Sequence, residues 1–170
     1  QQLLKENSPE SQQLVKIADS LGMVSKRLEA LMEYRRLMEG AIRPSLVKVD
    51  LTQLVTQQLL AYYDAFQKAQ INLDLDLMEG LFLTTDPEIL ERIIQNMISN
   101  VLKHGRRTAN ISLKKEEEHC IFTVKNIVQQ QILHLDKLTN RFYSENLSSS
   151  EDSSGLGLYI TQQLVEILGG

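Results

Sequence analysis

The chain has 170 residues, of which 42% are hydrophobic and 24% charged, and its formal net charge is −4. This composition is typical of a globular protein, and the acidic balance argues against a nucleic-acid-binding surface, which would normally be basic. No run approaches the ~18 apolar residues of a membrane span, and the single cysteine, Cys120, excludes an internal disulfide and a cysteine-rich metal site.

The first predicted element is a long helix that begins after Ser8 and ends at Gly40. Ser8 suits the N-cap, Pro9 the first helical position and Gly40 the C-terminal end. Apolar residues then recur at steps of three and four, which predicts a coiled-coil or bundle seam. Because "QQLLKEN" is typical of the end of another helix, we predict a helical hairpin over 1–40 that forms a dimeric four-helix bundle, and a linker over 41–46. The seam residues are Leu14, Ile17, Leu21, Val24, Leu28, Leu31 and Met38.

From residue 47 the sequence predicts strands and helices in separate runs. "VKVD", "INLDLDL" and "GLFLTT" are typical of short strands, and "ANISLKK" and "CIFTVKN" of a hairpin. "LTQLVTQQLLAYYDAFQKAQ" predicts one amphipathic helix with Leu54, Leu59, Tyr62 and Phe66 among its apolar positions. A short helical stretch, the polar segment "SENLSSSEDSS" and a last helix complete the chain. We therefore predict an α+β, two-layer sandwich domain over 47–170.

The helix predicted over 87–104 carries amide side chains beside its apolar face. Asp86 offers the N-cap. Asn96, Asn100 and Lys103 follow one another at steps of four and three on one arc, at the border of the apolar residues. That buried arc consists of Leu90, Ile93, Ile94, Met97, Ile98 and Val101.

The two amides have two interpretations. A half-buried amide without a partner costs about 1–3 kcal/mol, so something must satisfy it. A hydrogen bond to a neighbouring loop is the usual explanation for a lone asparagine. Two aligned amides followed by Lys103 favour a ligand, because amide oxygens suit a hydrated hard cation and lysine suits phosphate.

Two glycines, Gly155 and Gly157, directly precede the last predicted helix in "SSGLGLYI". They allow the backbone to approach an anion at the positive end of that helix. Such a pair is also common in an ordinary tight turn. Its position after a polar loop favours a phosphate-binding lid.

Together these segments resemble the sensor histidine kinases of two-component systems. "ERIIQNMISNVLKHG", "DKLTNRFY" and "SSGLGLYITQQLVEILGG" are similar to the N, F and second G boxes of that family in order and spacing, and "VDLTQLV" and "TTDPEIL" to its lead-in. The resemblance implies a histidine-kinase/gyrase-like ATPase fold that binds ATP and Mg²⁺. It also implies that the hairpin 1–40 belongs to the dimerisation and phosphotransfer domain.

The resemblance assigns roles to the helix over 87–104. Asn100 would hold the Mg²⁺ that bridges the ATP phosphates, Asn96 would lie beside the phosphates and metal waters, Lys103 would contact phosphate and His104 would lie near the nucleotide. Related ATPases have a glutamate general base where this chain has Asn96. An amide cannot accept a proton at neutral pH, which favours a kinase over a hydrolase.

The resemblance also assigns roles near the end of the chain. Phe142 and Tyr143 match the F box, which packs against the lid. The turn from the lid into the last helix would bind nucleotide through Gly155, Leu156 and Gly157.

Two departures from the family pattern concern the base and the phosphoacceptor. "VKNIVQQQ" occupies the place of the first G box, so Asn126 replaces the aspartate that accepts a bond from the adenine amino group, and both glycines are missing. An Asn carbonyl still accepts that bond without a negative charge, so we expect weaker adenine binding. Residues 1–40 contain no histidine, so we expect the phosphoacceptor upstream and the chain to be a fragment.

We therefore expect Mg-ATP binding, donation of the γ-phosphoryl group to a histidine of the homodimeric bundle, and relay to an aspartate of a response regulator receiver domain. The segment would be cytoplasmic, within a membrane-bound sensor, without contact to membrane or nucleic acid. One alternative is a degenerate, non-catalytic dimerisation and signal-relay module. A related serine kinase or anti-sigma regulator is another, although such proteins have no need of a heptad hairpin.

Overall fold

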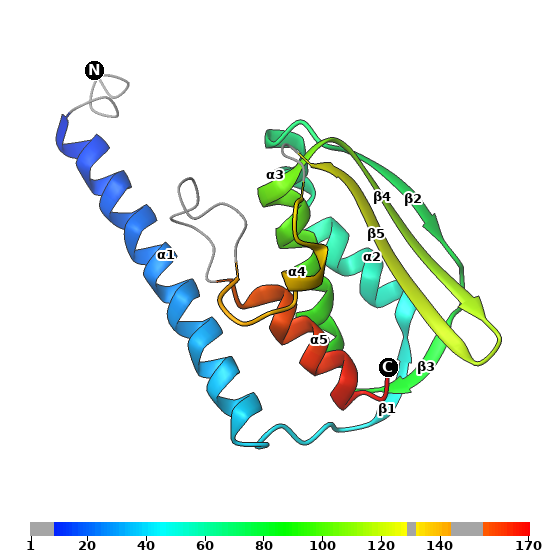
Figure 1. The fold of residues 1–170 in the computed structure, drawn as a ribbon. Coiled ribbons are helices and arrows are strands. Elements are labelled where there is room, and N and C mark those ends of the chain that lie inside the picture. The colour runs from blue at the N-terminus through cyan, green and yellow to red at the C-terminus, as the bar shows by residue number, and fades with distance from the viewer. Residues whose placement is uncertain (1–8, 129–131, 144–154) are drawn as a thin grey trace.

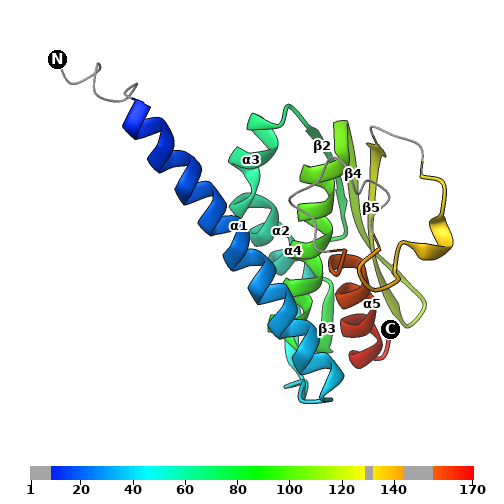
Figure 2. The same cartoon turned by 60° about the vertical axis from the view of Figure 1, so that its left-hand side comes forward.

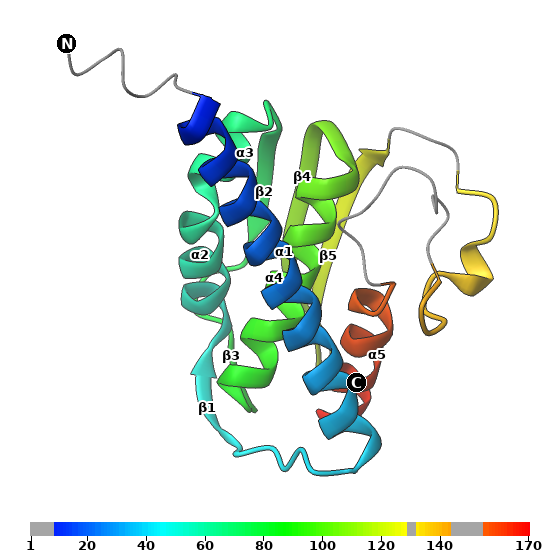
Figure 3. The same ribbon diagram turned by 90° about the vertical axis from the view of Figure 1, so that its left-hand side faces the viewer.

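The computed structural model describes residues 9–128, 132–143 and 155–170 (Figure 1). One long helix lies beside a domain that consists of a helical layer and a sheet layer (Figures 1 and 3). In chain order the elements are α1 (Pro9–Met38), β1 (Val47–Asp50), α2 (Leu51–Ala61), α3 (Tyr63–Lys68), β2 (Asn72–Leu77), β3 (Phe82–Thr85), α4 (Pro87–His104), β4 (Gly105–Glu116), β5 (His119–Val128), a short 3-10 helix (Leu135–Lys137) and α5 (Gly157–Ile167).

The strands form two sheets. The larger sheet has the order β2-β4-β5, in which β4 is parallel to β2 and antiparallel to β5, and the smaller sheet pairs β1 with β3 in antiparallel fashion. Helices α2, α4 and α5 lie on one side of the larger sheet (Figures 1 and 3). This arrangement confirms the predicted α+β, two-layer fold.

Helix α4 is the central element of the core, because its apolar arc packs in two directions. Towards the sheet, Ile94, Ile98 and Val101 are buried together with Ile111 and Leu113 of β4. Each such side chain stabilises the fold by about 1.5–3 kcal/mol. A second cluster joins α4 to α5 and consists of Ile89, Ile93, Leu156, Tyr159, Ile160 and Leu164.

Residues 51–70, predicted as one helix, form two. The chain leaves helical geometry at Tyr62 (φ −101°, ψ 4°), and α3 begins at the next residue. The single-helix prediction is wrong at this point because neither glycine nor proline marks the break. The predicted core positions Leu54, Leu59 and Phe66 are nevertheless buried, and Tyr62 is partly buried.

The two ends of α1 have different surroundings. Its C-terminal part packs on the domain through Ala30, Tyr34 and Leu37, whereas its N-terminal part extends away from the domain (Figures 1 and 2). Most of the predicted seam is exposed there: Leu14, Ile17, Leu21, Val24 and Leu28 are all 56–67% accessible.

Several predictions fall on residues outside the described ranges. The first arm of the hairpin and the Ser8 cap lie in 1–8, and the whole polar segment "SENLSSSEDSS" is 144–154. The hairpin and its four-helix dimer therefore stay predictions, and so does the assignment of 1–40, 41–46 and 47–170 to hairpin, linker and domain. Within the part of the chain that the structure describes, the helices are too short or too polar to cross a membrane.

Candidate functional site

Asp86 fixes the N-terminus of α4. One carboxylate oxygen accepts hydrogen bonds from the backbone N–H groups of Glu88 (3.0 Å) and Ile89 (3.1 Å), and the other accepts one from the N–H of Ser45 at 2.6 Å. The bond from Ser45 is the main reason that the pKa of this buried aspartate is lowered, and it outweighs the opposing effect of burial. The predicted N-cap is thus confirmed, and it also ties the segment after α1 to α4.

Asn96 and Asn100 lie one helical turn apart on α4, and both are half-buried. The side-chain nitrogen of Asn96 is buried and has no hydrogen-bond partner among the described residues. Leaving such a donor unsatisfied costs about 1–3 kcal/mol. A neighbouring loop does not satisfy Asn96 in the described structure, so this atom suits an acceptor such as a phosphate oxygen.

The last turn of α4 is basic. Lys103 and His104 are its final residues, and Lys103 makes an interaction within the chain. Partial burial, followed by the charge of Lys103, lowers the pKa of His104. The neutral imidazole is therefore favoured near pH 7, and Lys103 is the charged residue of the last helical turn.

Asn126 lies on β5 and faces the helical layer. It has the same strand parity as Phe122 and Val124, whose side chains pack on the core. Its side-chain nitrogen lies 3.4 Å from the place where a Cβ on Gly105 would be. The Asn126 amide therefore lies beside the C-terminal end of α4, where Lys103 and His104 lie, and Gly105 itself is required by Val101, whose carbonyl oxygen would be 2.5 Å from that Cβ.

The turn before α5 requires glycine at Gly155. Its φ is +64°, and a Cβ there would lie 2.6 Å from the carbonyl carbon of Phe142 and 2.9 Å from the oxygen of Tyr143. The structure thus brings the predicted F-box residues directly against this turn. Leu156 is fully buried against α4, and beside Gly157, the first residue of α5, there is open space.

The N-terminus of α5 is a suitable place for an anion. Its N-cap, Leu156, makes no side-chain cap hydrogen bond. The first N–H groups of a helix have no partner within the helix and carry partial positive charge. The site residues on α4, at the end of β5 and at this turn thus come from elements that pack on one another.

The contact between α1 and this turn is a feature that sequence reasoning missed. Arg141 donates a hydrogen bond to the Tyr34 hydroxyl (3.2 Å) and lies 5.3 Å from the ring centroid of Tyr159. Tyr34 also contacts the ring of Phe142 edge-on at 5.9 Å. No spacing signal reveals this cluster, because its members lie far apart in the chain.

An ion pair adds to the same contact. Arg92 of α4 donates to Glu33 of α1 at 2.8 Å, and the two side chains are 35% and 17% exposed. A pair this shielded is screened less by salt than a surface pair. Both contacts therefore hold the C-terminal part of α1 beside α4 and α5.

Comparison with known families and curated proteins identifies relatives. The family model for histidine kinase-, DNA gyrase B-, and HSP90-like ATPases matches residues 85–170. The signal transduction histidine-protein kinase AfsQ2 of Streptomyces coelicolor is 32% identical over 149 residues, which cover 84% of this chain and 26% of that protein. The sensor histidine kinase YcbM of Bacillus subtilis is 28% identical over 134 residues, which cover 74% of this chain and 42% of that protein. The chain thus spans less than half the length of these relatives.

Solved structures show the same fold. The histidine kinase AdeS of Acinetobacter baumannii superposes with a TM-score of 0.78 at 17% identity, covering 94% of this chain and 75% of that chain. Full-length ShkA in complex with AMPPNP superposes with a TM-score of 0.80 at 19% identity, covering 96% of this chain and 36% of that chain. Both comparisons extend over α1 as well as the domain.

Proposed function

The chain belongs to the histidine kinase-, DNA gyrase B- and HSP90-like ATPase family, as an ATP-binding catalytic region of a sensor histidine kinase, and from this premise we propose that it binds Mg-ATP beside α4. One observation carries the proposal. The Asn96 side-chain nitrogen is buried without a partner, and a phosphate oxygen would satisfy it.

The phosphates and the metal would be held from two sides. Asn96 donates from α4, Lys103 supplies charge at the end of that helix, and the N-terminus of α5 supplies backbone N–H groups at Gly157. The side-chain oxygen of Asn100 is a suitable Mg²⁺ ligand, because hard cations prefer oxygen. The bound Mg²⁺ would neutralise charge on the phosphate oxygens.

The adenine would lie at the end of β5. The Asn126 amide faces the helical layer there, and an amide oxygen accepts a hydrogen bond from an amino group. His104, whose neutral form is favoured, lies at the neighbouring end of α4. The turn at Gly155 would be held in shape by Phe142, Tyr143 and Leu156, which would contribute to nucleotide binding in this indirect way.

The chemistry of Asn96 favours transfer over hydrolysis. A carboxamide cannot take a proton from water at neutral pH. Phosphoryl transfer depends mainly on positioning and charge neutralisation. A site with Asn96 would therefore hold ATP until a protein acceptor arrives.

The whole protein would then act as a two-component sensor kinase. We propose that it dimerises through a helical hairpin that includes α1, phosphorylates a histidine of that hairpin, and passes the group to an aspartate of a response regulator. The parent protein would be anchored in a membrane with this region in the cytoplasm. The exposed seam on α1 supports dimerisation, because it leaves large apolar side chains in water.

Asn126 gives a reason to keep a second candidate. The neutral amide and the continuous β5 strand suit a module that has lost tight nucleotide binding and serves dimerisation and signal relay. Titration calorimetry of the chain with ATP, with and without Mg²⁺, distinguishes the two. Saturable, Mg²⁺-dependent binding supports the kinase, and absence of binding at millimolar ATP supports the relay module.

A further inference from the structure

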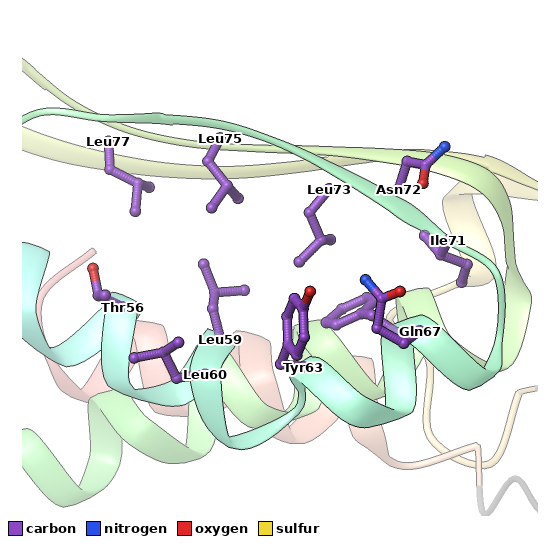
Figure 4. A pocket seen from close by; sticks show the side chains of 11 residues that line it. Thr56, Leu59, Leu60, Tyr63, Gln67, Ile71, Asn72, Leu73, Leu75 and Leu77 are labelled. Carbon is purple, nitrogen blue, oxygen red and sulfur yellow. The ribbon is translucent and has the colours of Figure 1, made fainter.

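A second concave surface lies on the other side of the domain from the α4–α5 contact. It is a groove of about 420 Å³ between the α2–α3 segment and strand β2 (Figure 4). Leucines line both walls, with Leu59 and Leu60 on the helices and Leu73, Leu75 and Leu77 on the strand. None of the proposed nucleotide-binding residues lines this groove.

The groove leaves apolar side chains in water. Leu60 is 67% exposed, Tyr63 52% and Leu75 47%. Figure 4 shows Leu73, Leu75 and Leu77 pointing from β2 towards the helices. The helical layer therefore covers this part of the sheet incompletely, with Leu75 exposed between the partly buried Leu73 and Leu77.

Strand β2 is also an edge strand of the larger sheet within the described residues. It pairs with β4 along one side over its whole length, Asn72–Leu77. Every second residue of a strand directs its N–H and C=O away from such a neighbour. Those groups offer a ready pairing surface for another extended chain.

Charge on the opposite face of β2 restricts the occupant. Asp74 and Asp76 alternate with the leucines and are exposed. Asp74 accepts a hydrogen bond from Asn110 (2.8 Å), and Asp76 pairs with Lys114 (2.8 Å). At the β2 edge the two carboxylates face one lysine, Lys114, and the next lysine of this face, Lys125, lies on β5 beyond Asn110. The edge therefore attracts basic side chains and repels acidic ones on a neighbouring strand.

We propose that β2 is a docking edge for an extended segment of a partner protein in which apolar and basic residues alternate. The segment adds to the sheet as a strand beside β2. Its apolar side chains enter the groove between β2 and the helices, and its basic side chains lie beside Asp74 and Asp76. Backbone pairing provides affinity, and the alternate side chains provide selectivity.

A second copy of this chain is a poorer occupant. Pairing of β2 with another β2 would bring Asp74 and Asp76 of both strands close together, and like charges on neighbouring strands are destabilising. A small apolar ligand would leave the strand edge and both carboxylates unused. The alternating segment is the occupant that uses the groove, the edge and the charge together.

The test uses a dye-labelled peptide of alternating leucine and lysine, about as long as β2 and blocked at both ends. Fluorescence anisotropy measures its binding to the 170-residue chain, and amide hydrogen exchange locates the site. One control peptide has the same composition with the leucines in one block, and another alternates leucine with glutamate. Analytical ultracentrifugation of the chain alone reports self-association through this edge.

We expect the alternating leucine–lysine peptide to bind best and to slow exchange of β2 amides. Leu75→Asp, which places a charge in the groove, should weaken binding by at least about tenfold. Asp74→Lys should weaken it by a smaller factor, whereas Thr123→Ala on β5, at the far edge of the described sheet, should leave it unchanged. Thermal melting confirms that each variant is folded.

Three results would overturn the proposal. The first is equal binding of the blocked-leucine peptide, which indicates nonspecific attraction. The second is unchanged exchange of the β2 amides. The third is a dimer of the chain that Leu75→Asp dissociates, which assigns the edge to a second copy.

Discussion

The two sides of the proposed nucleotide site are built differently. On the phosphate side, the buried Leu156 anchors the turn against α4, with glycines before and after it. On the base side, β5 continues through Asn126 to Val128, which pairs with Gly105, and the pairing with β4 shifts register between Arg106 and Ala109, opposite Ile127 and Asn126. The resemblance to histidine kinases leads one to expect a glycine-rich box there.

This difference separates two parts of nucleotide recognition. The residues that we propose for phosphate and metal binding lie on α4, a helix whose position the core determines. The base side has a neutral amide in place of a carboxylate. We therefore expect binding energy to depend mainly on phosphates and Mg²⁺, with modest discrimination between bases.

The largest expected effect is loss of the metal ligand. Asn100→Ala should lower the affinity for Mg-ATP by about 100-fold or more, because amide oxygen is a ligand that alanine cannot replace. Titration calorimetry measures the change. Asn110→Ala, on the exposed face of the sheet, is the matched control and should bind normally. Equal affinity of Asn100→Ala and the parent chain would contradict the assignment.

A matched glycine pair tests the turn on the phosphate side. Gly155→Ala should destabilise the chain by about 1–3 kcal/mol, since the new Cβ meets the Phe142 backbone at positive φ. Gly157→Ala should change stability little, because its Cβ would enter open space. Urea unfolding measures both. Equal destabilisation by the two variants would show that the close approach at Gly155 is not what holds the turn.

Restoring the carboxylate tests the base side. Asn126→Asp should strengthen ATP binding roughly tenfold, because a hydrogen bond to a charged acceptor is stronger than one to an amide. The gain should be absent for GTP, which has no amino group at the same ring position. Competition against a fluorescent nucleotide measures both constants, and an equal gain for ATP and GTP argues against this contact.

The smallest expected effect concerns the far end of α4. The pKa of Asp86 is lowered in the folded chain, so its ionised form stabilises the fold above the ordinary aspartate value of about 3.9. This contribution is lost as pH falls through the folded-state pKa. Asp86→Asn should therefore cost about 1 kcal/mol near pH 6 and less in acid. Chemical unfolding at several pH values measures the difference, and a pH-independent cost would contradict the account.

Much of the α4 side could be predicted from the sequence. The spacing of Ile93, Ile94, Ile98 and Val101 has a strong helical period, and Asp86 before a proline marks the start. The helix accordingly has the predicted bounds, 87–104. Local patterns of this kind are sufficient to predict a helix and its ends, because the residues that determine them lie within a few turns of one another.

Other features depend on contacts between distant residues. The break at Tyr62 has no local marker, and the stacking of Arg141 on Tyr34 and Tyr159 joins three separate segments. The fit of Gly155 against Phe142 was expected from family resemblance and not from periodicity. The dimeric hairpin depends on residues outside the described ranges and stays a prediction.

The central claim is that the Asn96 amide donates to a nucleotide phosphate. The most direct measurement follows the Asn96 side-chain NH₂ resonances by NMR while a non-hydrolysable ATP analogue and Mg²⁺ are added, with Asn96→Asp identifying the signals. We predict large shifts and slower hydrogen exchange for Asn96 and unchanged Asn110 signals. Saturating nucleotide that leaves the Asn96 resonances and their exchange unchanged would contradict the claim.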